Sequence, residues 1–473
     1  MSSVPPLFRL NHVPAGRWLV GHLWEFKQRP LDVMAAWREQ HGDLVQFRLG
    51  TRSCYLISHP DLAEEVLLHK PDDFAKIYDP KKPSGLGLVL GNGLLTSEGP
   101  LWRKNRRLMQ PAFQRQRVTA MAPDIAAAGE GLLKRWDELD DRRPVDISVE
   151  MMKVTLDVIT RTMLGSSLLD EVDRLAPALD TLIRYAFRSF HNPFRVPLWV
   201  PTPGNRAFQH AKASVDELIY GVIRERRAGG IRRDDLLDQL LYAVDQDTGV
   251  GLTDEQLRDE LLTIAAAGHE TTANGLSWAW YLLATHRDMR ARLHDELARV
   301  LEGRLPVIED LSRLVYTRSV FEETLRLYPP APALQRKAIR ETSLGGCSIR
   351  AGSLIIISLW NIHRHPDLWK DPEAFRPERF TAEADAARHR LAWMPFGAGH
   401  RTCIGNHFAM IEGPLLLALI AQRYEMDLPP GQTVEPEVAV TVRPKHGLQM
   451  TIRRRNESAG YTKQVTSATS QGA

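Results

Sequence analysis

One cysteine in a glycine-rich loop, followed by an apolar helical segment, constrains this chain more than any other feature. The decapeptide Phe396–Gly405 holds Cys403 with Arg401 two residues before it, and an apolar helical run extends from Phe408 to Leu419. A thiolate at the start of a helix is stabilised by the unpaired N–H groups of the first turn and by the helix dipole. A lone cysteine is more often a buried structural residue. This setting instead favours the charged sulfur, which is the form that ligates metals.

The spacing within the loop matches a haem-binding signature. Haem iron needs one strongly donating sulfur beneath a flat, close-fitting group, and glycines allow that close approach. Phe396, Gly399, Arg401, Cys403 and Gly405 match the pattern F-G-x-G-x-R-x-C-x-G, in which the chain resembles the cytochrome P450 family. The resemblance implies that Cys403 is the axial ligand of a haem b iron and that the other four residues belong to the cofactor site.

A second motif lies inside a helical pattern that we expect over about residues 253–283. The stretch 267–272 reads Ala-Gly-His-Glu-Thr-Thr, and glycine and threonine are poor helix formers. The Thr271 hydroxyl can bond back to the Ala267 carbonyl and open the helix locally. The stretch resembles the A-G-x-[DE]-T motif of the same family. That resemblance implies a groove for dioxygen beside the iron, with Thr271 and Glu270 as catalytic residues that supply protons.

Three histidines near these motifs are not expected to bind metal. His269 occupies the variable position of the second motif and is interpreted as a packing residue. His363 and His365 have the spacing of a metal-binding pair, but no third ligand lies near them in the sequence, so we expect a structural role in a loop.

Several side chains are candidates for the haem propionates. Trp102 and Arg106 are four residues apart, so on a helix they share one face. They resemble the family's W-x-x-x-R pair, which binds a propionate through the donor fork of the arginine. By family position, Arg336 and either His400 or Arg401 are further candidates for this role.

The helix of Trp102, expected over residues 99–117, also carries a group of basic residues. Lys104, Arg107, Arg115 and Arg117 fit a solvated basic face. We interpret this face as a candidate docking surface for an acidic electron donor.

A third signature predicts a brace for the cysteine loop. Glu323 and Arg326 are three residues apart on a helix expected over residues 316–327. Together with Arg379 they resemble the family's E-x-x-R and P-E-R-F pair, which implies a buried ion network with a structural role.

The substrate pocket is expected from three apolar segments. Residues 76–98 form a Gly-, Pro- and Leu-rich loop, residues 187–203 form a proline-rich aromatic segment that resembles the family's lid, and residues 331–334 are apolar. The loop over 76–98 has an alternative interpretation as a flexible surface connection, but its leucines favour the pocket.

Composition limits the remaining possibilities. The 473 residues are 43% hydrophobic and carry a formal charge of +3, which supplies a large core and gives no sign of nucleic-acid binding. The three widely spaced cysteines indicate neither a disulfide framework nor a structural zinc site. No apolar run approaches the ~18–20 residues of a membrane span, and the N-terminus lacks a signal-peptide core. We therefore expect a soluble, cytoplasmic protein of the bacterial kind.

The fold implied by the resemblance is mainly α with small β-sheets. One haem-binding domain is expected over residues 1–455, followed by a disordered tail over residues 456–473 that is rich in Ser, Thr, Gln and Gly. Two strands at residues 44–49 and 54–58 alternate apolar and polar residues and predict a hairpin.

The activity implied is that of a monomeric haem-thiolate monooxygenase. It would insert one oxygen atom of O2 into a hydrophobic small molecule such as a fatty acid, terpenoid or steroid. The electrons would come from a separate ferredoxin or flavodoxin with its NAD(P)H reductase. Two alternatives stay open: a peroxygenase driven by peroxide, which the intact acid–threonine pair disfavours, and a non-catalytic haem-thiolate sensor.

Overall fold

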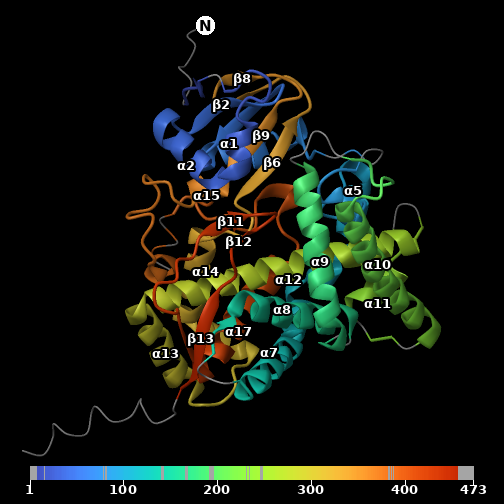
Figure 1. The fold of residues 1–473 in the computed structure, drawn as a ribbon, viewed down its shortest axis with the longest axis vertical. Coiled ribbons are helices and arrows are strands. Elements are labelled where there is room, and N and C mark those ends of the chain that lie inside the picture. Colours follow the sequence, from blue (N-terminus) through green and yellow to red (C-terminus); the bar gives the residue numbers. More distant parts are fainter. Residues whose placement is uncertain are drawn as a thin grey trace, which may run out of the picture.

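A strand-rich part and a larger helical part make up the molecule (Figure 1). The structure, a computed structural model, describes residues 8–455, apart from 15, 78, 80–82, 140–142, 166–168, 191–195, 231, 234, 246–248, 382, 383, 385 and 387. The expected tail at residues 456–473 therefore lies outside the described residues. The family's mainly helical fold with small sheets is confirmed.

Helices account for most of the described chain. Their bounds are α1 Leu23–Gln28, α2 Pro30–His41, α3 Pro60–Glu64, α4 Gly87–Leu90, α5 Gly99–Met109, α6 Arg115–Ala120, α7 Ala122–Asp137, α8 Ile147–Leu164, α9 Leu169–Phe190, α10 Pro203–Gly229, α11 Leu236–Tyr242, α12 Asp254–Thr285, α13 Arg287–Leu301, α14 Val315–Leu327, α15 Leu359–Ile362 and α17 Asn406–Arg423. None of the helices in the described part of the chain is long and apolar enough to cross a membrane.

The strands form one larger sheet and three small ones. Their bounds are β1 Asn11–His12, β2 Leu44–Leu49, β3 Arg52–Ile57, β4 Phe74–Ala75, β5 Val145–Asp146, β6 Ala333–Ala338, β7 Thr342–Leu344, β8 Cys347–Ile349, β9 Leu354–Ser358, β10 Tyr424–Asp427, β11 Pro436–Val438, β12 Val442–Pro444 and β13 Gln449–Arg454. The larger sheet has the order β1-β2-β3-β9-β6-β4, and the small sheets are β10-β13-β5, β11-β12 and β7-β8.

The predicted hairpin is confirmed at the centre of the larger sheet. Strands β2 and β3 pair antiparallel, with Leu44 opposite Ile57 and Leu49 opposite Arg52. Strand β9 then joins β3 in parallel. Because β9 is buried on both faces, its run of apolar residues does not alternate.

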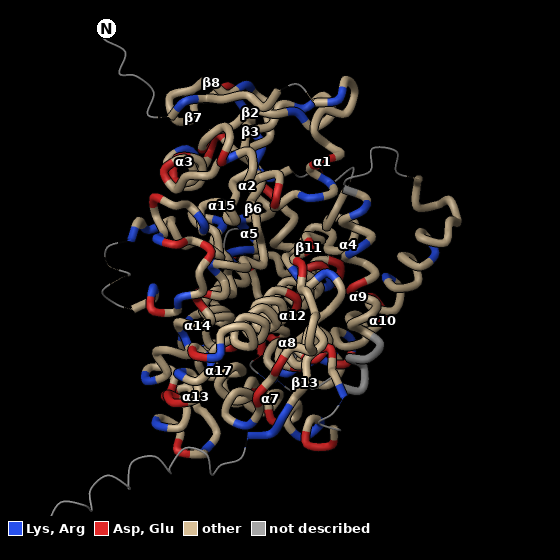
Figure 2. Tube along the Cα trace, turned by 60° about the vertical axis from the view of Figure 1, so that its left-hand side comes forward, with Lys and Arg blue, Asp and Glu red and all other residues tan. Residues whose placement is uncertain are grey.

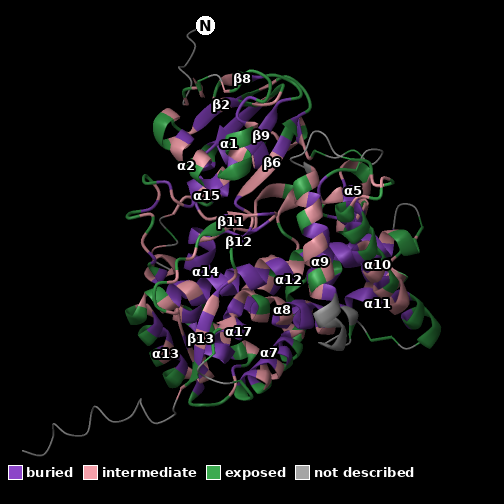
Figure 3. Cartoon of the chain, viewed as in Figure 1, coloured by how far each residue is buried: buried purple, intermediate pink, exposed green. Residues whose placement is uncertain are grey.

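Helix α12 is the centre of the helical part (Figure 3), where most of its residues are buried. Helices α8, α10, α14 and α17 pack against it. It begins with a capping box between Thr253 and Gln256, which satisfies the free N–H groups of its first turn. From Thr271 to Thr285 it carries no charged residue, and in Figure 2 the charged residues lie mostly on the surrounding elements.

The single helix expected over residues 99–117 was wrong. Helix α5 ends at Met109, a 3₁₀ turn follows over Gln110–Phe113, and α6 starts at Arg115. Pro111 has no N–H to continue the α-helical hydrogen bonds, and the backbone becomes extended at Gln114 (ψ 144°) before α6 begins.

Candidate active site

The cysteine loop is fixed by its own backbone and by a neighbouring helix. The Cys403 N–H donates to the Phe396 carbonyl (2.9 Å), and the Thr402 hydroxyl donates to the Gly399 carbonyl (2.7 Å). Gly399 has a φ of 76°, and a Cβ on it would lie 2.3 Å from the Leu67 carbonyl oxygen. Only glycine satisfies both the conformation and the contact.

Cys403 lies shortly before α17, which begins at Asn406 with Gly405 as its N-cap. The side chain has accessible surface. Desolvation by the surrounding protein nevertheless raises the pKa of the thiol, which the Gly405 N–H and the charge of Arg106 counteract. The thiol is therefore open to an incoming ligand although the surrounding protein disfavours its charged form.

A cluster of cations with one carboxylate lies beside this loop. Arg401 forms an ion pair with Glu98 (Nη2–Oε2 3.2 Å), and its guanidinium lies 4.5 Å from the centre of the Trp102 ring. Burial lowers the pKa of Arg401 to about 10 and also lowers that of Arg336. Burial and the charges of Arg401 and Arg336 lower the pKa of Lys76 to about 7.

This cluster tests whether the residues fit a haem. The Arg401 Nε atom is buried without a hydrogen-bond partner within the described ranges. In the part of the chain that the structure describes, several desolvated cations are compensated here by the single carboxylate of Glu98, so the cluster can bind additional anions. The two propionates of a haem would supply two carboxylates. The residues therefore fit the cofactor. Lys76 was not predicted, because no motif surrounds it and only the fold brings it to Arg401.

Trp102 and Arg106 lie against the cysteine loop, as their predicted role requires. Arg106 donates to the Thr402 carbonyl (2.9 Å), and the Trp102 ring meets that of His400 edge-on with 5.3 Å between centres. Their bonding to a propionate stays a prediction, as it does for Arg336, His400 and Arg401.

On α12 the Thr271 hydroxyl donates to the Ala267 carbonyl (2.7 Å), the relation expected from the motif. Glu270 is buried, and its Oε1 atom accepts a hydrogen bond from Thr441 (2.6 Å). Burial raises the pKa of the Glu270 carboxyl. A neutral carboxylic acid can donate a proton, which is the role predicted for this residue. Thr441 was missed because it belongs to a loop without a motif.

The histidines have structural partners. His269 is buried, with its Nδ1 atom 2.6 Å from the Ala265 carbonyl. The His363 Nε2 atom accepts from the Met394 N–H (3.0 Å), and His365 lies 3.1 Å from Asp43.

The predicted brace is present in full. Glu323 and Arg326 are both inaccessible to solvent and form a bidentate pair at 2.6 and 2.8 Å. Arg379 contacts the same carboxylate (Nε–Oε1 3.2 Å), and the Arg376 N–H donates to it (2.8 Å). The remaining donors of Arg326 bind the carbonyls of His363, Pro372 and Ala374.

The loop expected over the pocket is held against α12. The N–H groups of Asn92 and Leu94 donate to Asp259 (2.7 Å) and Glu260 (2.9 Å), so carboxylates of α12 fix its backbone. Of the expected lid, Phe194 lies outside the described residues, and Trp199 is 81% exposed. The Trp199 ring therefore does not close a pocket in this conformation.

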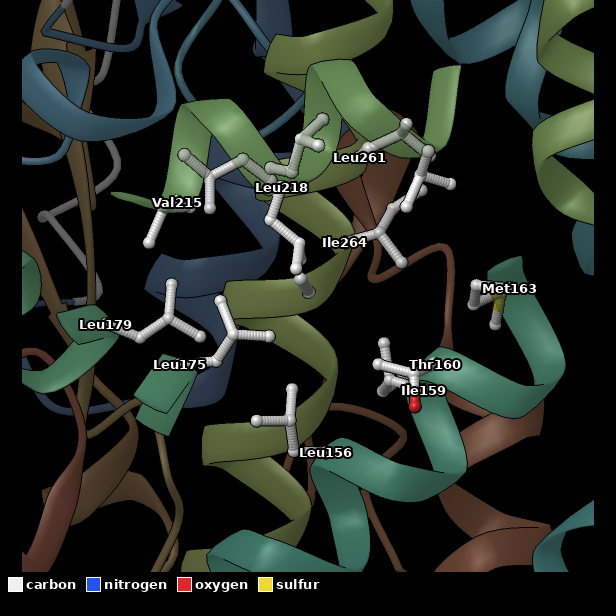
Figure 4. Close-up of a pocket in the computed structure, with 14 residues that line it drawn as sticks. Leu156, Ile159, Thr160, Met163, Leu175, Leu179, Val215, Leu218, Leu261 and Ile264 are labelled. Carbon is white, nitrogen blue, oxygen red and sulfur yellow. The ribbon is translucent and has the colours of Figure 1, made fainter. Parts of the chain in front are cut away.

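An apolar cavity of about 40 Å³ lies between α8, α9, α10 and α12 (Figure 4). Thr160 is the one polar side chain among its lining residues, and its hydroxyl is bonded within α8. None of the predicted site residues lines this cavity, so it is distinct from the cysteine site.

A hollow of about 590 Å³ is lined by Trp102, Arg103, Arg106 and Arg107 of α5 and by His400 of the cysteine loop. Of the predicted docking residues, only Arg107 lines it.

Comparison with known proteins identifies the family. The family model "Cytochrome P450" matches residues 12–452. Cyclooctat-9-en-7-ol 5-monooxygenase of Streptomyces melanosporofaciens is 37% identical over 92% of this chain and 93% of its own length. Cyclooctatin synthase of the same organism is 36% identical over 91% of the chain and 92% of its own. Pentalenene oxygenase of Streptomyces avermitilis is 32% identical over 95% of this chain and 98% of its own length.

The chain belongs to the cytochrome P450 family and is a monooxygenase of that family. Membership implies a haem-thiolate cofactor, dioxygen as a substrate and a redox partner.

Proposed function

We propose that the protein uses haem b, held by Cys403, to oxidise an apolar terpenoid with electrons from a separate ferredoxin or flavodoxin system. The observation that carries this proposal is the exposed Cys403 shortly before α17, beside a cluster of desolvated cations that includes Arg401. When bound, the haem supplies the activation of dioxygen and the insertion of one oxygen atom into a carbon–hydrogen bond.

The protein's own residues hold the cofactor and move protons. Arg401, Arg336 and Lys76 would bind the propionates, which would satisfy the free Arg401 Nε atom. Thr271 and Glu270 lie consecutively on α12, where the threonine hydroxyl donates to the Ala267 carbonyl and burial raises the pKa of the glutamate carboxyl. We assign to this pair the movement of protons along α12 toward the cofactor site.

The substrate class rests on the relatives and on the apolar segments. Two relatives have names that give cyclooctat-9-en-7-ol and pentalenene as the compounds on which they act. Of the three classes compatible with an apolar pocket, these names favour a terpenoid over a fatty acid or a steroid.

The electron donor is expected to dock on the basic side of the cysteine loop. Of the four predicted docking residues, Arg107 and Arg115 are exposed, and Arg107 lines the hollow described above together with Arg103. A basic surface of this kind complements an acidic protein and accelerates its association at low ionic strength.

A carbon-monoxide difference spectrum of the dithionite-reduced protein, followed by titration with a panel that includes pentalenene, fatty acids and steroids, tests the proposal. We expect a strongly red-shifted, thiolate-type Soret band that Cys403→His abolishes, and a high-spin shift with a terpenoid. A band typical of histidine-ligated haem in the unmodified protein would refute the ligand. A high-spin shift only with fatty acids or only with steroids would refute the substrate class.

A further inference from the structure

The tip of the β11–β12 hairpin contacts α12 at the candidate proton-delivery residues. The hairpin closes with Val438 opposite Val442, and the Ala439 N–H donates to the Thr441 carbonyl (3.1 Å). The indole N–H of Trp278 on α12 donates to the Val442 carbonyl (3.1 Å). The tip is therefore anchored to the helix, and Thr441 is only 5% exposed.

The donor and acceptor roles of the Thr441 hydroxyl are determined by its two neighbours. The Asn274 amide nitrogen lies 2.9 Å from the Thr441 hydroxyl, which lies 2.6 Å from Glu270 Oε1. An amide N–H₂ group can only donate, so the hydroxyl oxygen accepts from Asn274. Its own hydrogen is then directed at Glu270. This arrangement holds the Oε1 atom of the carboxyl in place.

Charged groups continue from this point to the surface. Arg443, two residues after Thr441, forms ion pairs with Asp180 of α9 (3.1 Å) and Glu437 of β11 (3.2 Å). Asp180 also pairs with Arg184 (2.6 Å), and both side chains are almost half exposed. Of these charged groups, Arg443, Asp180 and Arg184 are close enough to Glu270 to influence the pKa of its carboxyl.

We propose that Thr441 is a positioning residue that directs the Glu270 carboxyl toward its proton-transfer partner in the dioxygen groove. The inference rests on the proposed function of Glu270 and Thr271, and it deepens that function by identifying what orients the acid. Thr441 does not itself contact the reacting atoms. Its hydroxyl, oriented by Asn274, restricts a buried carboxyl that would otherwise rotate between several positions.

The sign of the effect on the Glu270 pKa follows from its neighbours. Burial raises this pKa, the Thr441 hydrogen bond and the charges of Arg443 and Arg184 lower it, and Asp180 raises it. Removal of the Thr441 hydroxyl removes one of the influences that stabilise the ionised form. The pKa of Glu270 should then rise further.

The first experiment is a pH titration of the holoprotein by infrared difference spectroscopy. The carboxyl band that disappears in Glu270→Gln is assigned to Glu270. In Thr441→Val this band should move to the frequency of a weaker hydrogen bond, and its midpoint should shift to higher pH. Thr441→Ser, which keeps the hydroxyl, should restore both. If Thr441→Val does not fold, Asn274→Ala tests the same arrangement, since it frees the hydroxyl to rotate.

A matched control exists elsewhere in the chain. The Thr317 hydroxyl donates to Glu296 (2.7 Å), and both side chains are buried. Thr317→Val removes the same kind of bond far from the motif in sequence. It should leave the Glu270 band and its midpoint unchanged, so any effect of general destabilisation is separated from positioning.

The second experiment measures peroxide released per NADPH oxidised, with a [2Fe–2S] ferredoxin, its reductase and a panel terpenoid that binds. Loss of one hydrogen bond should raise the peroxide share about 2- to 10-fold in Thr441→Val, and serine should reverse it. An unchanged Glu270 band in Thr441→Val would overturn the positioning role whatever the enzyme's activity. A changed band with unchanged peroxide would show that Thr441 orients Glu270 but that Glu270 does not serve the reaction.

Discussion

Replacement of Arg326 by methionine is the most direct test of the buried brace behind the cysteine loop. Glu323 and Arg326 have no accessible side-chain surface, and the pair is bidentate at 2.6 and 2.8 Å. Methionine fills part of the space but removes the charge. Among the described residues, the Glu323 carboxylate would then keep only Arg379, at 3.2 Å, as a charged partner.

The magnitude follows from the burial. Breaking a buried ion pair by removing one partner costs about 3–5 kcal/mol, since the other charge stays desolvated. Arg326 also binds the carbonyls of His363, Pro372 and Ala374, which would lose a donor. For 473 residues the unfolding entropy is about 1 kcal/mol/K, so the melting temperature should fall by about 3–5 °C.

Urea unfolding followed by circular dichroism, with thiolate-type haem absorbance as a second probe, measures this effect. Arg29→Met is the matched control, because Arg29 pairs with Asp32 at the same spacing of three residues (2.7 Å) while the two side chains are 75% and 63% exposed. It should cost less than about 1 kcal/mol. The double variant Glu323→Leu/Arg326→Met should cost less than the sum of the single variants. Equal losses for Arg326→Met and Arg29→Met would refute the reasoning.

Three further predictions concern other buried groups. Burial raises the pKa of Glu412 to about 8. The folded protein therefore binds a proton at this carboxyl more tightly than the unfolded chain does. The contribution of Glu412 to the free energy of unfolding is lost as pH rises from about 4.5 to about 8. The urea midpoint of Glu412→Gln should therefore rise relative to that of the unmodified protein over this pH range. A difference that does not change with pH would contradict the assignment. In Gly93→Ala the new Cβ would lie 2.1 Å from the Thr263 hydroxyl oxygen. This clash should lower the free energy of unfolding by about 1–3 kcal/mol and make the loop more sensitive to protease. Gly87→Ala is the control, because its new Cβ would lie 3.7 Å from the nearest atom, and it should change neither quantity. Arg401→Leu should accelerate haem transfer to apomyoglobin about 10- to 100-fold, and an unchanged rate would exclude a propionate contact.

The chemistry-bearing residues were readable because each belongs to a local pattern. Cys403 and its glycines are adjacent in sequence, Thr271 bonds to Ala267 within one helical turn, and Glu323 and Arg326 are three residues apart. Short-range backbone geometry determines such relations, and the structure reproduces them. The break at Pro111 was also readable, but the apolar and basic pattern across residues 99–117 was given more weight than the missing N–H of proline.

The sequence by itself determined the family, the cysteine loop, the α12 motif and the composition of the brace. Only the tertiary structure decided that Lys76 joins Arg401, that Asp259 and Glu260 hold the 92–94 loop, and that Thr441 directs its hydroxyl at Glu270. Thr441 and Glu270 are 171 residues apart. No local periodicity links positions so distant, because their contact depends on how the hairpin packs against α12.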